Sequence, residues 1–389
     1  MAERDEELTF AGTTNLDRLA EIPDDRHRQA IQRAIDLGLE AADSVQDRTI
    51  STFSRGYQPA FAGINTFLKV PYLEDVHQVG GHEVAIVGAP FDMGTTFRPG
   101  ARWAPQAVRR ISALYDGYNL DMAVDLFEEL DIVDLGDVFV IPSNIEKTFA
   151  QIDKAVDHIA SSGAFPVVIG GDHSIGYPDV KAVARQVDGN VGIVHLDRHI
   201  DLAERDMDER MHTTQWFHAT RIPNIPSANL VQIGIGGWAG KKAGMAVARE
   251  RGTTVLTIGD VERLGVERAA EAALEIASRN TKAIFLSLDI DVVDPANAPG
   301  TGTPEPGGLS SREMLRFISI VAREAPLCGM EVVEVSPPYD SGDITSLLAC
   351  RSILDVLAVL VAERKLGRRA RGAPQSADQA PPSGSIRRP

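Results

Sequence analysis

Ionisable side chains crowd the end of the apolar segment VGIVHLDRHIDL, residues 191–202. Residues two apart in an extended chain point to the same side, so Asp197, His199 and Asp201 can converge there. Three other apolar runs end in similar side chains: Asp172 and His173 follow the first, Asp289, Asp291 and Asp294 the second, and Glu334 the third. Four such endings in one chain predict a single shared site and argue against scattered surface acids.

These side chains have the chemistry of a binuclear metal site. Several carboxylates in one pocket repel one another unless positive charge lies between them, and two divalent cations would supply that charge. Oxygen and imidazole ligands without a thiolate suit manganese, nickel, iron or cobalt better than a structural zinc ion. We therefore expect two divalent ions at this site.

The elements that would position these residues alternate along the chain from about residue 83. Apolar runs typical of buried strands span 83–90, 165–171, 191–197, 229–235, 253–260, 283–291 and 329–337. Helical patterns lie at 105–118, 145–163, 267–280 and 311–324. Continuous apolar strands separated by helices indicate an α/β fold of three layers, α/β/α, with a mainly parallel sheet. In such a sheet, ligands bind beyond the carboxyl ends of the strands, where these acids and histidines stand.

The chain divides into three parts by composition. Residues 1–78 form an N-terminal extension, in which 24–45 has the periodicity of a helix. Residues 79–365 hold the alternating strands and helices and would be the catalytic domain. Residues 366–389 are rich in Pro, Gly, Ser and Arg, a composition typical of a disordered tail.

Net charge and cysteine content limit the classes of partner. The formal charge of −16 disfavours nucleic acid and anionic membranes and suits a cationic substrate. The apolar runs fall short of a membrane span, and the acidic N-terminus lacks the apolar core of a secretory signal. The two cysteines, Cys328 and Cys350, make no disulfide framework, so we expect a cytoplasmic protein with both thiols buried.

Four motifs resemble the metal motifs of the ureohydrolase superfamily, the group of arginases, agmatinases and guanidinobutyrases. They are GGDHS at 170–174, HLDRHID at 195–201, SLDIDVVDP at 287–295 and EVSP at 334–337. The resemblance extends over about residues 83–362, and residues 88–112 are similar to the agmatinase-like branch. It implies an arginase-like fold with two divalent metal ions per subunit.

The resemblance also implies a role for each motif residue. His173 and Asp201 would bind one ion, His199 and Asp291 the other, and Asp197 and Asp289 would bridge both. Asp294 would lie in a turn outside the ligand set, and His195 would be a core residue beside the ligands.

The implied chemistry is hydrolysis of a guanidinium group. A hydroxide bridging the two ions would attack the central carbon of the substrate. Glu334 would hold the cationic substrate through charge-assisted hydrogen bonds. His212, in DERMHTTQW, would carry a proton to the leaving amine.

Two departures from the usual superfamily pattern bear on the substrate. The arginase-like Asn/Ser/Gly/His loop is absent, and Arg198 stands where the superfamily has a small residue. We expect Arg198 to pair with Glu204 or Asp208. The segments LDRHID, DERMHTTQWFHAT, GIGGW and EVVEVSPPYD, with the long extension, resemble the nickel-dependent guanidine hydrolases. That resemblance implies conversion of free guanidine and water to urea and ammonia.

The same resemblance implies nickel in preference to manganese, a homo-oligomer that we expect to be a hexamer, and nickel-loading accessory proteins. Trp216, Phe217, His218 and Trp238 would close the pocket around so small a substrate. A manganese-dependent agmatinase or guanidinobutyrase is the alternative, because it shares every metal residue named above. A non-catalytic scaffold is disfavoured, since all six ligands are present.

Overall fold

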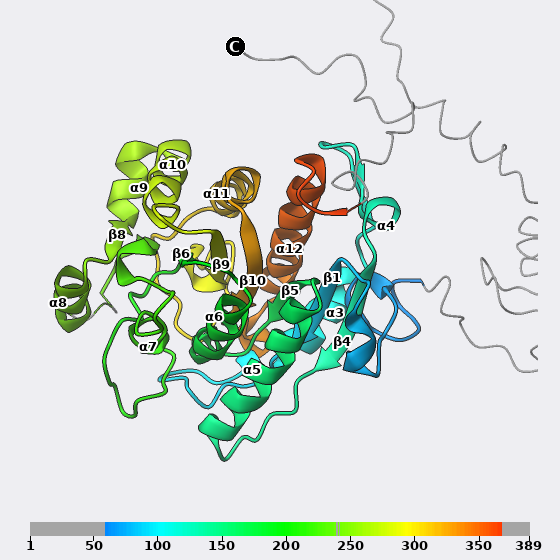
Figure 1. The fold of residues 1–389 in the computed structure, drawn as a ribbon, viewed down its shortest axis with the longest axis horizontal. Helices are drawn as coiled ribbons and strands as arrows, with labels where there is room; N and C mark the ends of the chain where they lie inside the picture. The colour runs from blue at the N-terminus through cyan, green and yellow to red at the C-terminus, as the bar shows by residue number, and fades with distance from the viewer. Residues whose placement is uncertain (1–58, 239, 241, 368–389) are drawn as a thin grey trace, which may run out of the picture. The chain divides into compact units, whose positions relative to one another are not determined.

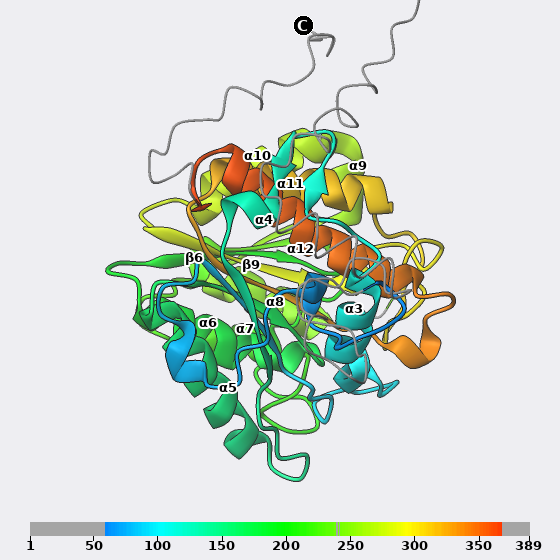
Figure 2. The ribbon, with the colours of Figure 1, turned by 90° about the vertical axis from the view of Figure 1, so that its right-hand side faces the viewer.

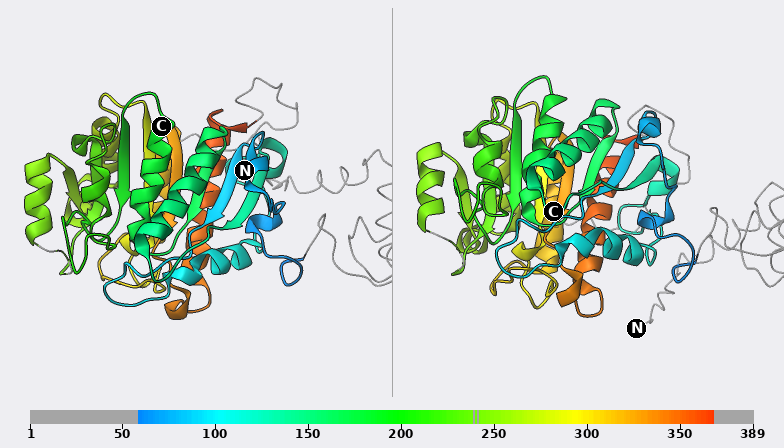
Figure 3. Two further views of the ribbon diagram at one scale, coloured as in Figure 1. Left: turned by 60° about the horizontal axis from the view of Figure 1, so that its bottom comes forward. Right: turned by 90° about the horizontal axis from the view of Figure 1, so that it is seen from below.

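The computed structural model describes residues 59–238, 240 and 242–367. At its centre lies an eight-stranded sheet in which neighbouring strands are parallel (Figure 1, Figure 3). The strand order is β4 (Ile132–Asp137), β1 (Val84–Gly88), β5 (Phe165–Ile169), β10 (Leu327–Val333), β9 (Ala283–Asp289), β6 (Val191–Leu196), β7 (Leu230–Ile235) and β8 (Thr254–Thr257). The helix expected over 24–45 and residues 368–389 of the expected tail lie outside the described residues.

Helices cover both faces of this sheet. On one face α10 (Val266–Ala277), α11 (Ser311–Glu324) and α12 (Ile344–Ala362) pack side by side, and on the other lie α5 (Ile145–Ser161), α6 (Gly176–Arg185) and α7 (Gln215–Ala219) (Figure 2). The predicted three-layer α/β/α arrangement with a parallel sheet is thus confirmed.

Apolar residues on both sides of the strands account for the three layers. Every residue of β1, β5, β6, β7 and β9 is buried, as in strands covered on both faces. α5 begins after Asn144, whose side chain caps the first turn. It then buries Phe149, Ile152, Val156 and Ile159 in one stripe against the sheet layer.

In two places a helical turn begins inside a predicted apolar run and ends the strand early. The run 253–260 contributes only β8, because Thr257 forms a capping box with Asp260 and starts α9 (Ile258–Leu264). The run 283–291 contributes β9 only as far as Asp289, whose side chain accepts a hydrogen bond from the Asp291 amide and starts a single helical turn. Asp291 is therefore carried by a turn and not by the strand.

Helix α12 is, in the part of the chain that the structure describes, the one helix long and apolar enough to cross a membrane by length and composition. An 18-residue window of this 19-residue helix has a mean hydropathy of 2.0, although Arg351 and Asp355 interrupt the apolar sequence. In the structure 78% of this helix window is buried, and the helix packs against α11 and α3 (Ala104–Ser112). Its apolar surface thus forms part of the protein core.

The segment just before the first strand is also part of the core. Phe67 and Leu68 are buried, and the Phe67 amide donates to Asp134 Oδ2 over 2.7 Å. Asp134, on β4, also receives hydrogen bonds of 2.8 and 3.0 Å from the Arg109 guanidinium. The compact unit that contains the sheet begins at Asn65, inside the region expected to be an extension.

Candidate metal centre

The carboxyl ends of four neighbouring strands form the site. β5, β10, β9 and β6 lie next to one another in the middle of the sheet. These strands bring the predicted site residues to one edge of the sheet. His173 follows β5 and Glu334 follows β10. Asp289 is the last residue of β9 and Asp291 follows it, while Asp197, His199 and Asp201 follow β6. The structure therefore brings together all six residues predicted to bind metal; five are buried and His199 is partly exposed.

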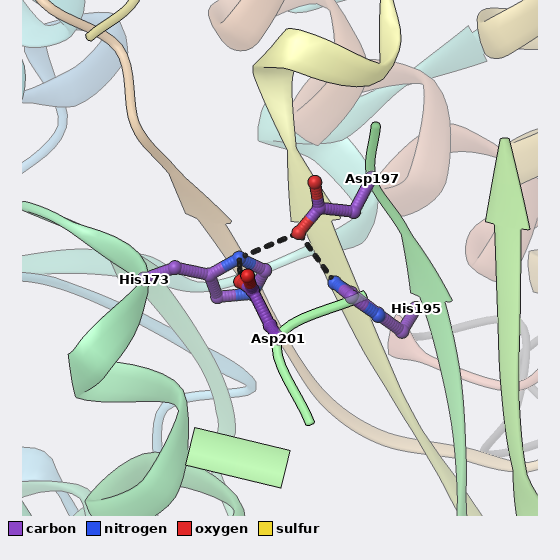
Figure 4. A group of neighbouring side chains, drawn as sticks. All are labelled: His173, His195, Asp197 and Asp201. Atoms are coloured by element: carbon purple, nitrogen blue, oxygen red, sulfur yellow. Dashed lines mark hydrogen bonds and ion pairs between the residues drawn. The ribbon is translucent and has the colours of Figure 1, made fainter. Parts of the chain in front are cut away.

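One group of potential ligand atoms surrounds the imidazole of His173 (Figure 4). Its Nδ1 atom lies 3.1 Å from Asp197 Oδ2, 3.2 Å from Asp201 Oδ2 and 3.0 Å from Asp289 Oδ2. A single ring N–H cannot satisfy carboxylates from three different residues. The arrangement suits a cation among these atoms.

A second group lies beside the first. His199 Nδ1 is 3.0 Å from Asp291 Oδ2 and 3.3 Å from Asp197 Oδ1. Asp197 thus directs one carboxylate oxygen to each group, as its predicted bridging role requires. Asp289 directs Oδ2 to His173, while its Oδ1 accepts a 2.8 Å hydrogen bond from the Asp291 amide, so its bridging role stays a prediction.

Loop conformation, and not strand alternation, brings the ligands after β6 together. The strand ends at Leu196, so the expectation that Asp197, His199 and Asp201 converge by alternating along it is wrong. Asp201 has φ 45° and Glu334 has φ 62°, in the left-handed region that residues other than glycine rarely adopt. Such strain persists only where the surrounding structure holds it, and it concentrates at functional sites.

The electrostatics of the cluster favour added positive charge. Burial alone would lower the pKa of His173, but hydrogen bonds to Asp197, Asp201 and Asp289 raise it well above its ordinary value. Burial and the neighbouring carboxylates of Asp291 and Asp197 raise the pKa of Asp289 well above the ordinary range. Without metal ions, protons must supply the positive charge that these acids require.

The donor set fits divalent ions. Ligand atoms lie within 4.8 Å of one another in two sets, His173, His195, Asp197 and Asp201 in the first and Asp197, His199 and Asp291 in the second. Carboxylate oxygen and imidazole nitrogen are the donors that manganese, nickel, iron and cobalt accept. These two sets would hold the ions, with Asp289 beside the first set; the first set also includes His195, which was expected to lie outside the ligands.

The two predicted catalytic residues touch each other beside the cluster. His212 Nδ1 lies 2.8 Å from Glu334 Oε1, which also accepts a 2.8 Å hydrogen bond from the His173 amide. On the other side of the ring, Nε2 lies 2.7 Å from Thr96 Oγ1 and 3.1 Å from the Thr96 amide nitrogen. Thr96 can donate its N–H to a neutral ring and accept the Nε2 proton of a charged ring at its hydroxyl. Its position accommodates both protonation states of His212.

A cavity of about 340 Å³ lies at the cluster. The residues that line it include His199, Asp201, Asp289, His212, Thr96, Thr303, Arg205, Asp206 and Met207. Ligand residues and the predicted proton carrier thus share one cavity. Arg205 adds a positive charge to a lining that is otherwise rich in acids.

The residues expected to close the pocket do not line this cavity. Trp216 is fully buried, with its ring 5.5 Å from that of His173. Phe217 and His218 border a separate surface pocket, and Trp238 is 96% exposed. The prediction of an aromatic wall fails for the described residues, because closeness in sequence to a motif does not fix the direction of a side chain.

The expected pairing of Arg198 with Glu204 or Asp208 is also wrong. Arg198 is buried, and its guanidinium donates to backbone carbonyls, from Nη1 to Gly234 over 2.8 Å and from Nη2 to Pro306 over 3.2 Å. The side chain therefore lies between the end of β7 and the loop after β9. Arg198 thus links two loops beside the ligands.

Four neutral side chains contact the ionisable residues of the site, although their residue types alone gave no reason to predict them there. Thr96 contacts His212, Gln215 Nε2 donates to Asp201 Oδ2 over 2.6 Å, Thr303 Oγ1 lies 3.1 Å from Asp291 Oδ2, and Ser287 Oγ lies 2.9 Å from His173 Nε2. The available signal is position: Thr96 and Ser287 fall inside stretches that already resemble family motifs.

Comparisons with known proteins show the family of this chain. Residues 82–358 match the Arginase family. Proclavaminate amidinohydrolase of Streptomyces clavuligerus is 40% identical over 296 residues, which cover 75% of this chain and 91% of that protein. Guanidinobutyrase of Pseudomonas aeruginosa is 32% identical over 303 residues, which cover 78% of this chain and 94% of that protein.

Solved structures share the fold. The structure of proclavaminate amidinohydrolase from Streptomyces clavuligerus superposes with a TM-score of 0.71 at 36% identity and covers 79% of this chain and all, 100%, of its own. A hypothetical agmatinase from Burkholderia thailandensis gives 0.72 at 31% identity, over 83% and 98%. The match over most of the chain, the parallel sheet and the His/Asp cluster show that the chain belongs to the Arginase family.

Proposed function

We propose that this chain is a binuclear-metal hydrolase that converts free guanidine and water to urea and ammonia. One observation carries the proposal: the Glu334 carboxylate and the His212 imidazole meet at 2.8 Å at the edge of the His/Asp cluster. An acid able to hold a guanidinium and a histidine able to move a proton are then adjacent to a metal-binding set.

The position of each group indicates its role in the proposed reaction. Two ions at the cluster would supply Lewis acidity and a water of lowered pKa. Glu334 Oε1 is engaged by the His173 amide and His212, which leaves Oε2 to bind the planar guanidinium. In the metal-free chain Glu334 also raises the pKa of His212 to about 9 against the opposing effect of burial. A protonated His212 ring beside the cluster could give its proton to the departing amino group.

Free guanidine is favoured over larger cations by two features. The segments HLDRHID and DERMHTTQWFHAT resemble those of guanidine hydrolases. Arg205 in the cavity lining disfavours agmatine, whose amine would bring a second positive charge toward the guanidinium of Arg205. A monocation without a charged tail avoids that repulsion.

A short guanidino acid is the second candidate. The cavity of about 340 Å³ has more room than a guanidinium alone requires, and Arg205 could bind a carboxylate at the far end of the substrate. Two similar proteins of Pseudomonas aeruginosa are named guanidinobutyrase and guanidinopropionase. Both names refer to substrates that carry a guanidinium and a carboxylate.

Nickel is the ion that we favour, with manganese as the alternative. A His/carboxylate site binds nickel more tightly than manganese in the Irving–Williams order, although metal supply also decides occupancy in the cell. We also propose that the protein is a cytoplasmic homo-oligomer, which we expect to be a hexamer, and that accessory proteins supply its nickel.

The test is a substrate panel with protein reconstituted with either nickel or manganese. Urea release is measured from guanidine, 4-guanidinobutanoate, 3-guanidinopropanoate and agmatine, with chelator-treated protein as the control. We expect guanidine to have the highest kcat/KM and the chelated protein to be inactive. A higher kcat/KM for a guanidino acid replaces the first candidate with the second. Urea from none of the four contradicts the proposed hydrolase.

A further inference from the structure

Arg198 carries a buried positive charge that the proposed reaction does not use. The residue is 1% exposed, and its terminal nitrogens donate to the backbone carbonyls of Gly234 and Pro306. Its Nε has no hydrogen-bond partner among the described residues. Burial of a guanidinium is costly, so the two hydrogen bonds that it does make indicate what the side chain is for.

The two carbonyls belong to parts of the chain that differ in rigidity. Gly234 lies in β7, where every residue is buried, whereas Pro306 lies in the long loop after β9 and is exposed. A Cβ at Gly236 would lie 3.0 Å from Arg198 Nη1, so this glycine leaves room for the guanidinium. The planar guanidinium can donate in two directions at once, and it ties the loop to the edge of the sheet.

The loop that Arg198 holds also reaches a predicted metal ligand. Thr303, three residues before Pro306, donates from Oγ1 to Asp291 Oδ2 over 3.1 Å. The backbone amide of Arg198 donates to the other oxygen, Asp291 Oδ1, over 3.2 Å. Both carboxylate oxygens of Asp291 are thus held, one by the Arg198 backbone and one by the loop that the Arg198 side chain anchors.

This loop has a second anchor of a different kind. The Gly307 amide donates to Asp294 Oδ2 over 2.8 Å, and this hydrogen bond is exposed to solvent. Water can replace an exposed hydrogen bond at little net cost, whereas a buried carbonyl that loses its donor stays unsatisfied. The bond from Arg198 to the loop is therefore the anchor that water replaces less readily.

We infer that Arg198 is a positioning residue for Asp291, acting through Thr303, in the metal site that the proposed function requires. Its guanidinium holds the loop at Pro306, and the loop keeps the Thr303 hydroxyl on Asp291 Oδ2. Hydrogen-bond partners of this kind orient the carboxylates that bind a metal. Asp291 belongs to the second set of ligand atoms, with Asp197 and His199, so Arg198 acts on the ion of that set.

The test measures metal affinity on the full chain, by chelator competition with Ni²⁺ alone and then with Co²⁺ alone. Arg198→Met fills similar space without the donors and is expected to weaken binding of one of the two ions about 10–100-fold. Thr303→Val removes the hydroxyl and is expected to weaken one ion by a similar factor. Asp294→Ala removes the exposed anchor of the same loop and is the matched control, with both affinities near those of the wild type.

The double variant Arg198→Met/Thr303→Val tests the route. If Arg198 acts through Thr303, the double variant binds metal about as weakly as the weaker single variant, and the two losses do not add. Losses that add in full overturn the inference, because Arg198 then acts on the site by another route.

The remaining outcomes are also decisive. Wild-type affinity for both ions in folded Arg198→Met overturns the inference, and so does equal weakening of both ions, which would indicate a general role in the core. If Arg198→Met does not fold, unchanged metal affinity in Thr303→Val overturns it instead. A wild-type chain that binds neither ion contradicts the proposed function itself.

Discussion

The indole of Trp216 stands edge-on to the imidazole of His173, with ring centroids 5.5 Å apart and ring planes at 89°. Trp216 is fully buried and lies 5.0 Å from the His195 ring as well. Trp216 therefore packs against the rings of both histidines and does not line the substrate cavity.

Trp216→Ala should consequently destabilise the fold without widening the substrate range. Removing so large a buried side chain costs about 3–5 kcal/mol. The free energy of unfolding of the metal-free protein, measured by urea denaturation, checks this. Trp238→Ala, at a 96% exposed indole, is the control and should leave the unfolding free energy unchanged. Hydrolysis of longer alkylguanidines by folded Trp216→Ala would restore the idea of an aromatic wall.

The contact between His212 and Glu334 predicts a pH dependence of stability. Burial alone would lower the pKa of His212, but the Glu334 carboxylate raises it to about 9. Because the unfolded chain has a pKa of about 6.5, the stabilisation is complete below that pH and is lost as pH rises toward 9. The difference in unfolding free energy between wild type and His212→Asn, both metal-free, should shrink by about 3 kcal/mol across this range. A difference that does not vary with pH would contradict the assigned contact.

Asp289→Ala tests the ligand set. It removes a carboxylate beside His173 and should lower the bound metal below two ions per chain, with loss of urea formation. Elemental analysis after reconstitution measures the metal content. Asp294→Ala is the matched control, because the Asp294 carboxylate accepts hydrogen bonds from the Ala296 and Gly307 amides in a turn. Two ions and normal turnover in Asp289→Ala would show that the ligand assignment is wrong.

Glu334→Gln tests the substrate carboxylate. The change preserves shape but removes the charge that offsets the guanidinium, at a cost of about 1.5–3 kcal/mol for a charge-assisted hydrogen bond. We expect kcat/KM to fall roughly 10- to 150-fold, in line with that cost, while elemental analysis finds the metal content unchanged. Loss of metal with intact substrate binding would make Glu334 a ligand.

Much of the fold was predictable because buried parallel strands leave continuous apolar runs. The same rule explains why three elements were not predicted correctly. The edge strand β4, IVDLGD, mixes apolar and acidic residues and gives no such run. In the sequence, the start of α9 looks like a continuation of the strand. Only the capping box of Thr257 and Asp260 in the structure shows that a helix begins there. α12 is hydrophobic on nearly all sides and shows no helical periodicity.

The site residues whose role follows from their residue type could be predicted from the sequence. Carboxylates and imidazoles after apolar runs marked the cluster from sequence alone. Thr96 and Ser287 could not be assigned in this way, because their contacts depend on loop placement and strand register. Trp216 was misplaced for the same reason, since its direction is set by packing of α7 against α6.

Hydrolysis of free guanidine is measured most directly by following ¹³C-labelled guanidine by NMR with nickel-reconstituted protein. We expect the guanidine carbon signal to be replaced by that of urea, with release of one ammonia per urea, and chelated protein to leave the signal unchanged. Guanidine that persists while the same preparation hydrolyses 4-guanidinobutanoate would show that free guanidine is not the substrate.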